Sequence, residues 1–308
     1  EEVPQATLDK AQRLKEKRRR QFEHDTACYE VMKSQRIEKQ GDVVKYQMAY
    51  DVQMSGRIGQ IGGAAQSASR EMKTAIYQRL KVRNYDIKSS QAFILRELLQ
   101  EAGIDASWIE EYLNADQAKH KYAERAGLAT DAWKTCLYAL FMGASLPDDI
   151  TSSGGEVRNT LEEEIHDPEA PAEDLEAAYR RLRGVIGDLA EALSAWHDYL
   201  VDQWLPQEAV HGRGGLRSVQ NATGMRYTVP EGIGRWDLQR KLAAFRLQGR
   251  EAAFIHTLTA LSEGYPYTVI SNEHDGLVVF GRIPEEAIEK ARQKLDMPYV
   301  RLPEKDFL

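Results

Sequence analysis

The clearest pattern of hydrophobic and polar positions lies in the last part of the chain. A helical spacing of apolar residues over 236–261 is followed by two short β-prone runs at 267–272 and 277–280. A second helical spacing covers 284–295, and a last β-prone run covers 299–302. Helices interleaved with short strands and tight turns are typical of an α+β fold.

A similar unit is predicted nearer the start. Residues 43–54 favour one or two strands, and the Gly-, Ser- and Ala-rich residues 55–70 favour a loop that enters a helix running to about Leu80. A short strand is predicted at 81–86, followed by an amphipathic helix over 89–102. The apolar face of that helix is formed by Phe93, Ile94, Leu98 and Leu99.

The rest of the chain has mainly helical spacing. Exposed helices are predicted over 7–40, and further helices over 104–145, where Asp105 and Thr130 are candidate N-caps. Helical spacing also covers 173–204. Two stretches rich in Gly and Pro predict non-regular structure, an exposed connection at 146–172 and an irregular segment at 206–235.

Composition adds limits to this outline. The 308 residues are 42% hydrophobic and 29% charged, which is typical of a globular protein. No apolar run is long enough to span a membrane, and the N-terminus lacks a signal-peptide pattern, so we expect a cytoplasmic protein in a bacterial, phage or plasmid setting. The chain starts at Glu1 rather than Met, which leaves its natural start open. Cys28 and Cys136 are predicted to be reduced and buried.

Charge changes the picture through its distribution. The formal charge of −7 argues against nucleic-acid binding when taken as a sum. Basic residues nevertheless gather in 10–20 and 73–83, whereas acidic residues gather in 148–149, 162–164 and 169–176. An acidic part and a basic part in one molecule would leave a track for phosphates.

Two acids stand at strand ends from distant parts of the chain. Asp86 ends the predicted strand 81–86, and Asp275 lies in the turn His274-Asp275-Gly276 between two predicted strands. A glycine lets such a turn close tightly and leaves the aspartate at its tip. Phosphoryl transfer from a nucleoside triphosphate uses two magnesium ions about 3.5–4 Å apart, held by few carboxylates. Asp86 and Asp275 are therefore the candidate ligands of two Mg²⁺ ions, for which Mn²⁺ is an alternative.

The motifs around these acids resemble those of family A (DNA polymerase I-like) DNA polymerases. Residues 85–96, YDIKSSQAFILR, are similar to the palm motif Asp-Tyr-Ser-Gln-Ile-Glu-Leu-Arg, in which Asp86 matches the metal-binding Asp and Gln91 the Glu beside the sugar. Residues 240–249, RKLAAFRLQG, resemble the motif Arg-Ala-Ala-Ile-Asn-Ala-Pro-Met-Gln-Gly. Residues 273–276, EHDG, resemble Val-His-Asp-Glu, with Gly in place of the last acid.

The fingers motif of that family is matched in part. Lys134 and Tyr138 lie at the family's spacing, whereas Thr130 and Met142 replace its Arg and Tyr. Ser55-Gly56-Arg57 resembles the Thr-Gly-Arg that contacts primer or template. The resemblance covers about residues 50–308, with no exonuclease-like segment before it, and is strongest in the last part.

This resemblance implies a right-hand polymerase fold with an antiparallel palm sheet and helical fingers. It implies a thumb-like helical segment at 1–50, palm parts at 51–103 and 236–308, and fingers with a helical insertion at 104–235. Lys134, Tyr138 and Gln91 would bind the nucleotide. The residues that would contact nucleic acid are Arg57, Arg240, Gln248 and His274.

The implied function is template-directed nucleotidyl transfer with a DNA primer-template and nucleoside triphosphates. Because Gln91 differs from both the Glu of DNA polymerases and the small residue of phage-type RNA polymerases, RNA remains an alternative product and template. A minimal or primase-like DNA polymerase and a catalytically weak nucleic-acid-binding replication accessory are further alternatives. Other replication proteins are open as partners, and no membrane partner is expected.

Overall fold

The computed structural model describes residues 5–40, 43–62, 64–77, 80–150, 155–165, 174–211 and 216–305. The chain divides into two units. Unit 1 combines Glu1–Lys88 with Glu251–Leu308, and unit 2 is Ser89–Arg250. The finer predicted division, into segments that end at residues 50, 103 and 235, stays a prediction.

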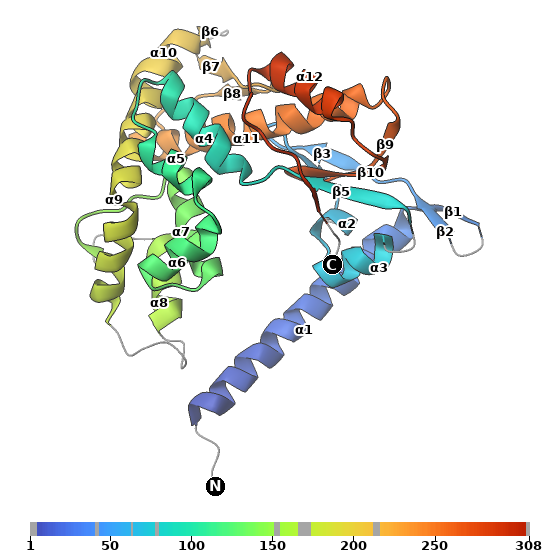
Figure 1. The fold of residues 1–308 in the computed structure, drawn as a ribbon, viewed down its shortest axis with the longest axis horizontal. Helices are drawn as coiled ribbons and strands as arrows, with labels where there is room; N and C mark the ends of the chain where they lie inside the picture. Colours follow the sequence, from blue (N-terminus) through green and yellow to red (C-terminus); the bar gives the residue numbers. More distant parts are fainter. Residues whose placement is uncertain are drawn as a thin grey trace. The chain divides into compact units, whose positions relative to one another are not determined.

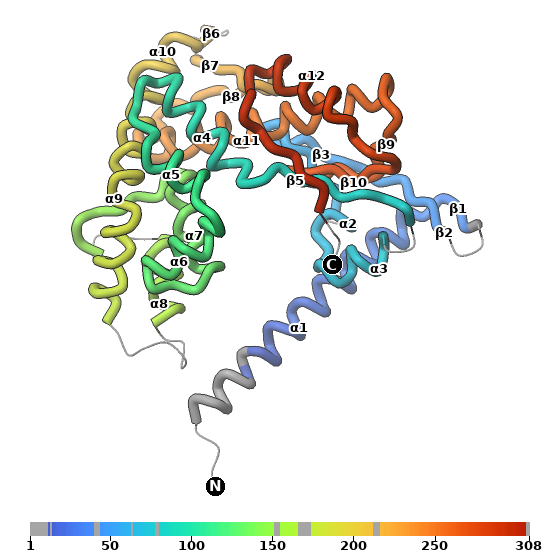
Figure 2. Tube along the Cα trace, viewed as in Figure 1, coloured from blue at the N-terminus to red at the C-terminus, as the bar shows by residue number. Residues whose placement is uncertain are grey.

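Unit 1 is built on a four-stranded antiparallel sheet with the order β11-β5-β10-β9. Its strands are β5 (Val82–Asp86), β9 (Tyr267–Asn272), β10 (Gly276–Gly281) and β11 (Glu304–Lys305). Strand β5 comes from the first segment of the unit and the other three from the last segment, and they lie side by side in the trace of Figure 2. The sheet therefore joins residues that are distant in sequence.

Both faces of this sheet are covered. Helix α12 (Glu285–Leu295) and the end of α11 (Arg235–Leu261) lie on one side, and α2 (Ala64–Ser67) and α3 (Arg70–Tyr77) lie on the other (Figure 1). Burial on both sides explains why β10 reads as a continuous apolar run, with Gly276 to Val279 all buried.

The N-terminal part of unit 1 packs onto the second face. Helix α1 (Gln5–Ser34) buries Cys28 and Met32 near its end, and Met32 packs against Ala64 and Ala65 of α2. Two short hairpins follow along the chain. They pair β1 (Arg36–Gln40) with β2 (Val43–Tyr46) and β3 (Tyr50–Val52) with β4 (Ile58–Gln60).

Unit 2 is mainly helical. Its helices are α4 (Ser90–Glu101), α5 (Ser107–Asn114), α6 (Ala118–Ala126), α7 (Thr130–Phe141), α8 (Glu156–Ile165), α9 (Leu175–Tyr199), the π-helical turn η2 (Leu200–Trp204), α10 (Leu205–Glu208) and the first part of α11. A small antiparallel sheet of β6 (Val210–His211), β7 (Arg217–Gln220) and β8 (Arg226–Thr228) completes it.

Four aromatic rings form the centre of the α5–α7 region. Trp108, Tyr112, Tyr122 and Trp133 have ring centroids 5.1–6.5 Å apart, in stacked, edge-on and tilted pairs. The Trp108 indole donates a hydrogen bond of 2.8 Å to the carbonyl oxygen of Val185 on α9. Trp133 is completely buried, so this cluster ties three short helices to the long α9.

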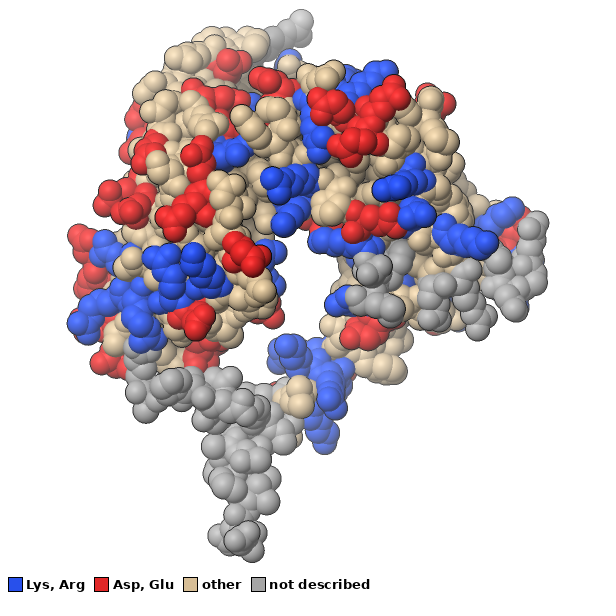
Figure 3. All heavy atoms as spheres, viewed as in Figure 1, with Lys and Arg blue, Asp and Glu red and all other residues tan. Residues whose placement is uncertain are grey.

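The excess of acidic residues lies in unit 2. Unit 1 contains 24 Lys and Arg residues against 22 Asp and Glu, and unit 2 contains 17 against 26. Basic side chains gather over α1, where Lys15, Lys17 and Arg18 are exposed (Figure 3). The unequal distribution of charge expected from the sequence is therefore present, although basic side chains also lie between the acidic ones on the visible face of unit 2.

The α+β prediction is confirmed, and so are most predicted elements. Several details were wrong. Residues 36–40, predicted as helix, form β1, and residues 58–60 of the predicted loop form β4. The N-cap of α5 is Ala106 and not Asp105. The region 146–172 contains α8, and the stretch 206–235 contains the sheet of β6–β8. Thr130 is the first residue of α7 and not its cap, and its hydroxyl lies 3.1 Å from His120 Nδ1. The last strand is β11 and not 299–302.

Two further sequence expectations can be compared with the structure. Cys28 and Cys136 are free thiols, and both are buried, as predicted. Among the described residues, no helix combines the length and the apolar character needed to cross a membrane.

Replacing Trp133 by Ala should lower the free energy of unfolding by about 3–5 kcal/mol, because a fully buried indole leaves a cavity among three other rings. Trp236, which is 52% exposed, provides the matched control, and its replacement by Ala should cost less than about 1 kcal/mol. Urea unfolding followed by circular dichroism measures both; equal losses would contradict the role of the cluster.

Candidate functional site

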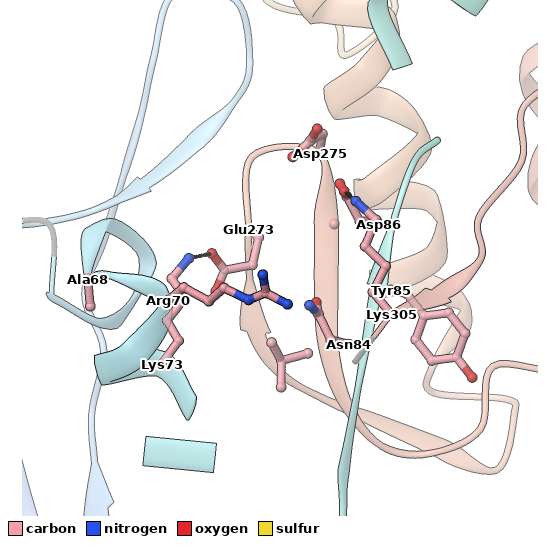
Figure 4. Close-up of a pocket in the computed structure, with 11 residues that line it drawn as sticks. Ala68, Arg70, Lys73, Asn84, Tyr85, Asp86, Glu273, Asp275 and Lys305 are labelled. Carbon is pink, nitrogen blue, oxygen red and sulfur yellow. Dashed lines mark hydrogen bonds and ion pairs between the residues drawn. The ribbon is translucent and has the colours of Figure 1, made fainter. Parts of the chain in front are cut away.

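The two candidate carboxylates meet at one end of the unit 1 sheet. Asp86 ends β5, and Asp275 lies in the turn between β9 and β10. Gly276 is the register partner of Asp86, and the Ile87 N–H donates a hydrogen bond of 2.8 Å to the Asp275 carbonyl oxygen. Figure 4 shows both carboxylates at this end of the hairpin. The strand register thus brings together two acids from distant parts of the chain.

Gly276 makes this juxtaposition possible. A Cβ atom at this position would overlap the carbonyl oxygen of Tyr85 and lie 3.2 Å from the Asp86 Cα. Only a residue without a side chain lets β10 approach β5 this closely where the acids stand.

An open cavity of about 490 Å³ lies beside the carboxylates. Its charged lining contains three acidic and three basic side chains, which are Asp86, Glu273, Asp275, Arg70, Lys73 and Lys305. Lys305 forms an ion pair with Asp86, and Lys73 Nζ lies 2.8 Å from Glu273 Oε2 (Figure 4). Partial burial lowers the pKa of Lys305. The cavity is therefore highly charged but has no net formal charge.

The donor set at this site fits magnesium. Among the residues that the structure describes, no group of three or more His, Cys, Asp or Glu side chains is arranged to enclose a metal ion. Magnesium is ordinarily held by one or two carboxylates, with water and substrate phosphates completing its shell. Asp86 and Asp275, which face a cavity with room for phosphates, offer that kind of partial shell.

Arg57 and His274 lie near the β9–β10 hairpin that carries Asp275. The Arg57 guanidinium forms an ion pair with Glu251, whose side chain is only 1% exposed. Desolvation lowers the pKa of His274, and the positive charge of Arg57 acts in the same direction, so this imidazole is mainly neutral at pH 7. Arg57, which is predicted to bind nucleic acid, therefore links the β3–β4 hairpin to α11 through its ion pair with Glu251.

In unit 2, helices α4 and α11 carry three of the residues that are predicted to bind the nucleotide or the nucleic acid. Gln91 lies in the first turn of α4, and its buried Oε1 has no hydrogen-bond partner among the described residues. Arg240 and Gln248 lie on α11, with the Arg240 guanidinium 4.5 Å above the Trp236 ring.

Ion pairs connect these two helices. Arg246 lies 2.7 Å from Glu101, and Arg250 pairs with both Glu97 and Glu101. Gly249 packs so closely on Asn221, in the turn between β7 and β8, that a Cβ atom would overlap it. Helix α11 therefore approaches the small sheet of unit 2 closely at Gly249.

Lys134 and Tyr138 share one face of α7, four residues apart. Lys134 Nζ lies 2.8 Å from Asp131 Oδ1, and the Tyr138 ring centroid lies 5.9 Å from that of Phe141. Gly143 follows the helix with φ of +90°, and a Cβ there would lie 2.7 Å from Arg240 Cγ. The end of α7 therefore contacts α11 at Arg240.

The sequence did not reveal all residues of the cavity. Lys73 begins the basic stretch 73–83, and Arg70 ends the Gly-, Ser- and Ala-rich stretch 55–70, but nothing in either stretch indicated a position beside the acids. Lys305 carried no signal, because the last strand was predicted earlier than it occurs.

Comparison with known proteins supports the fold. No known protein-family profile matches this sequence, and neither does any curated protein sequence. Among solved structures, the chain is similar to the polymerase domain of Pol1 from M. smegmatis, determined in complex with DNA primer-template and dNTP. The TM-score is 0.54 at 16% identity, over 84% of this chain and 47% of that one. This chain therefore has a polymerase-domain-like fold and spans about half the length of that polymerase chain.

Replacing Gly276 by Ala should lower the free energy of unfolding by about 1–3 kcal/mol, because the added methyl group would force β10 away from the Tyr85 carbonyl. Gly264 is the control, since a Cβ there meets nothing nearer than 3.9 Å. Chemical denaturation of the two variants measures the difference. A Gly276→Ala protein as stable as the Gly264→Ala protein would show that the strands do not need this contact.

Arg57 and Glu251 should be strongly coupled in stability. Either single replacement by Ala should cost about 3 kcal/mol, because it leaves the partner's charge buried. The double variant should lose clearly less than the sum of the two single losses, as a double-mutant cycle in urea measures. Additive losses would mean that the two side chains stabilise the unit independently.

Proposed function

We propose that this protein catalyses template-directed nucleotidyl transfer, with DNA as the product. The observation that supports it best is the meeting of Asp86 and Asp275 at one end of an antiparallel sheet, beside an open cavity with basic side chains. The polymerase-domain-like fold supports the same proposal, because that neighbour binds a DNA primer-template and a dNTP. A shared fold does not by itself imply a shared activity, so the carboxylates carry the proposed activity.

Asp86 and Asp275 would hold two Mg²⁺ ions in this reaction. Such ions lower the pKa of an attacking hydroxyl and neutralise the charge of a triphosphate. The two side chains suit this task because their backbone atoms are fixed by strand register and by the Ile87 hydrogen bond. Little reorganisation of the protein is then needed when the substrates bind.

Residues of unit 2 would bind the nucleotide and the nucleic acid. Lys134 would contact phosphate oxygens after exchanging its Asp131 partner, an exchange that costs little because Asp131 is 94% exposed. Tyr138 would stack on the nucleotide, and Gln91 would lie by its sugar. Arg240 and Gln248 of α11 would contact the duplex, together with Arg57 and His274 of unit 1.

Replacing either Asp86 or Asp275 by Asn should reduce magnesium-dependent primer extension about 100-fold or more, because each metal ion contributes several kcal/mol to the transition state. Asp51, an exposed residue of β3, provides the control, and its replacement by Asn should leave extension unchanged. Extension of a labelled primer on a DNA template measures all three variants.

The same assay separates the proposal from its alternatives. Extension that survives in the Asp86→Asn or the Asp275→Asn protein would remove that aspartate from the metal site. Wild-type protein that binds a primer-template but extends it with neither deoxyribonucleotides nor ribonucleotides would be a binding accessory. Extension with ribonucleotides alone would assign RNA as the product.

A further inference from the structure

Lys305 is placed at the candidate site by strand register. It pairs with Asn84 across β11 and β5, and Asn84 stands two positions before Asp86 on the same face of β5. The register partners of Asn84 and Asp86 on β10, Val278 and Gly276, line the same cavity. In an antiparallel sheet a long side chain reaches its diagonal neighbour, and Lys305 does so by forming the ion pair with Asp86.

Strand β11 has attachments to β5 besides the charge of Lys305. The neighbouring Glu304 holds the strand, since its Oε1 lies 2.5 Å from Arg83 Nη1 and its Oε2 accepts a 3.4 Å hydrogen bond from the Tyr85 hydroxyl. The Lys305 side chain is 48% exposed, so its ammonium has access to water but lies on a carboxylate inside the cavity. This arrangement is suited to a group that changes partners.

The charges of the cavity indicate what the second partner is. Lys305 is balanced by Asp86, and Lys73 by Glu273. A divalent cation bound by Asp86 and Asp275 would remove the acidic partner of Lys305, because two cations on one carboxylate repel each other. The cavity lining would then contain three basic side chains, and Glu273 would be its one acidic side chain that is not bound to a cation. Such a site attracts a polyphosphate anion.

We propose that Lys305 is an internal cation that holds Asp86 in the metal-free protein and turns to polyphosphate oxygens when a divalent cation takes that carboxylate. This inference rests on the proposed function for its substrate class, the nucleoside triphosphate.

The test measures Mn²⁺ binding to the full chain by the electron paramagnetic resonance signal of the free ion, with and without inorganic pyrophosphate. Lys305→Met removes the charge and keeps the length, Lys305→Arg keeps the charge, and Lys294→Met removes an exposed lysine of α12. Lys305→Met should bind Mn²⁺ alone about two- to fivefold more tightly than wild type, the range expected for a partly exposed ion pair. It should bind Mn²⁺ with pyrophosphate more weakly, whereas Lys305→Arg and Lys294→Met should resemble wild type.

The opposite signs of these two effects exclude a merely structural role, because a damaged site would bind both probes less well. Mn²⁺ affinity that is unchanged or lower in Lys305→Met, or pyrophosphate binding that is unchanged or stronger, would overturn the proposal. A loss of oligonucleotide binding with pyrophosphate binding intact would move Lys305 to the phosphodiesters of a strand and would also overturn it. Wild-type primer extension is measured in parallel. If the wild-type protein shows no primer extension but the Mn²⁺ result is as expected, the proposed function is rejected and the metal-free pairing of Lys305 with Asp86 stands.

Discussion

The pairing of β5 with β10 is the constraint on which the candidate site depends. Gly276 lies against the Tyr85 carbonyl so closely that no side chain fits there, and this contact fixes Asp275 beside the end of β5. The motif that this hairpin resembles has an acid at the position of Gly276. In this protein such a side chain would push the two strands apart, so the site contains the Asp86–Asp275 pair without a third carboxylate at that position. The glycine therefore decides how the two aspartates are placed and leaves no room for a carboxylate at its own position.

Local charge matters more than total charge in this protein. The chain is acidic overall, but the excess of acids belongs to unit 2, while unit 1 has slightly more basic than acidic residues. Within the cavity, three basic and three acidic side chains balance one another. Binding of divalent cations to the aspartates would change this balance toward the positive, and a polyphosphate would restore it. Metal and phosphate binding would thereby be coupled through the same few side chains.

Much of the fold follows from local sequence. The helices α4, α9, α11 and α12 and the strands β5, β9 and β10 lie where apolar spacing predicted them, because each buries one continuous face or run. The main errors lie where the spacing of apolar residues carries little information. Strands β6–β8 lie in a stretch of Gly and Pro whose pairing depends on neighbours and not on periodicity, and β11 is only two residues long. Helix α8 was hidden by the Gly- and Pro-rich residues on either side of it.

For the candidate site, the sequence by itself indicated Asp86 and Asp275 as candidates, because an acid at a strand end is a local pattern. Only the tertiary structure placed Lys305 on Asp86, 219 residues away, and Lys73 on Glu273, 200 residues away. It also showed that Arg57, which is proposed to contact nucleic acid, has a buried partner in Glu251. Local propensity determines which residues end a strand. The partners of their side chains are set by sheet register and by the closure of long loops, which no spacing along the chain encodes.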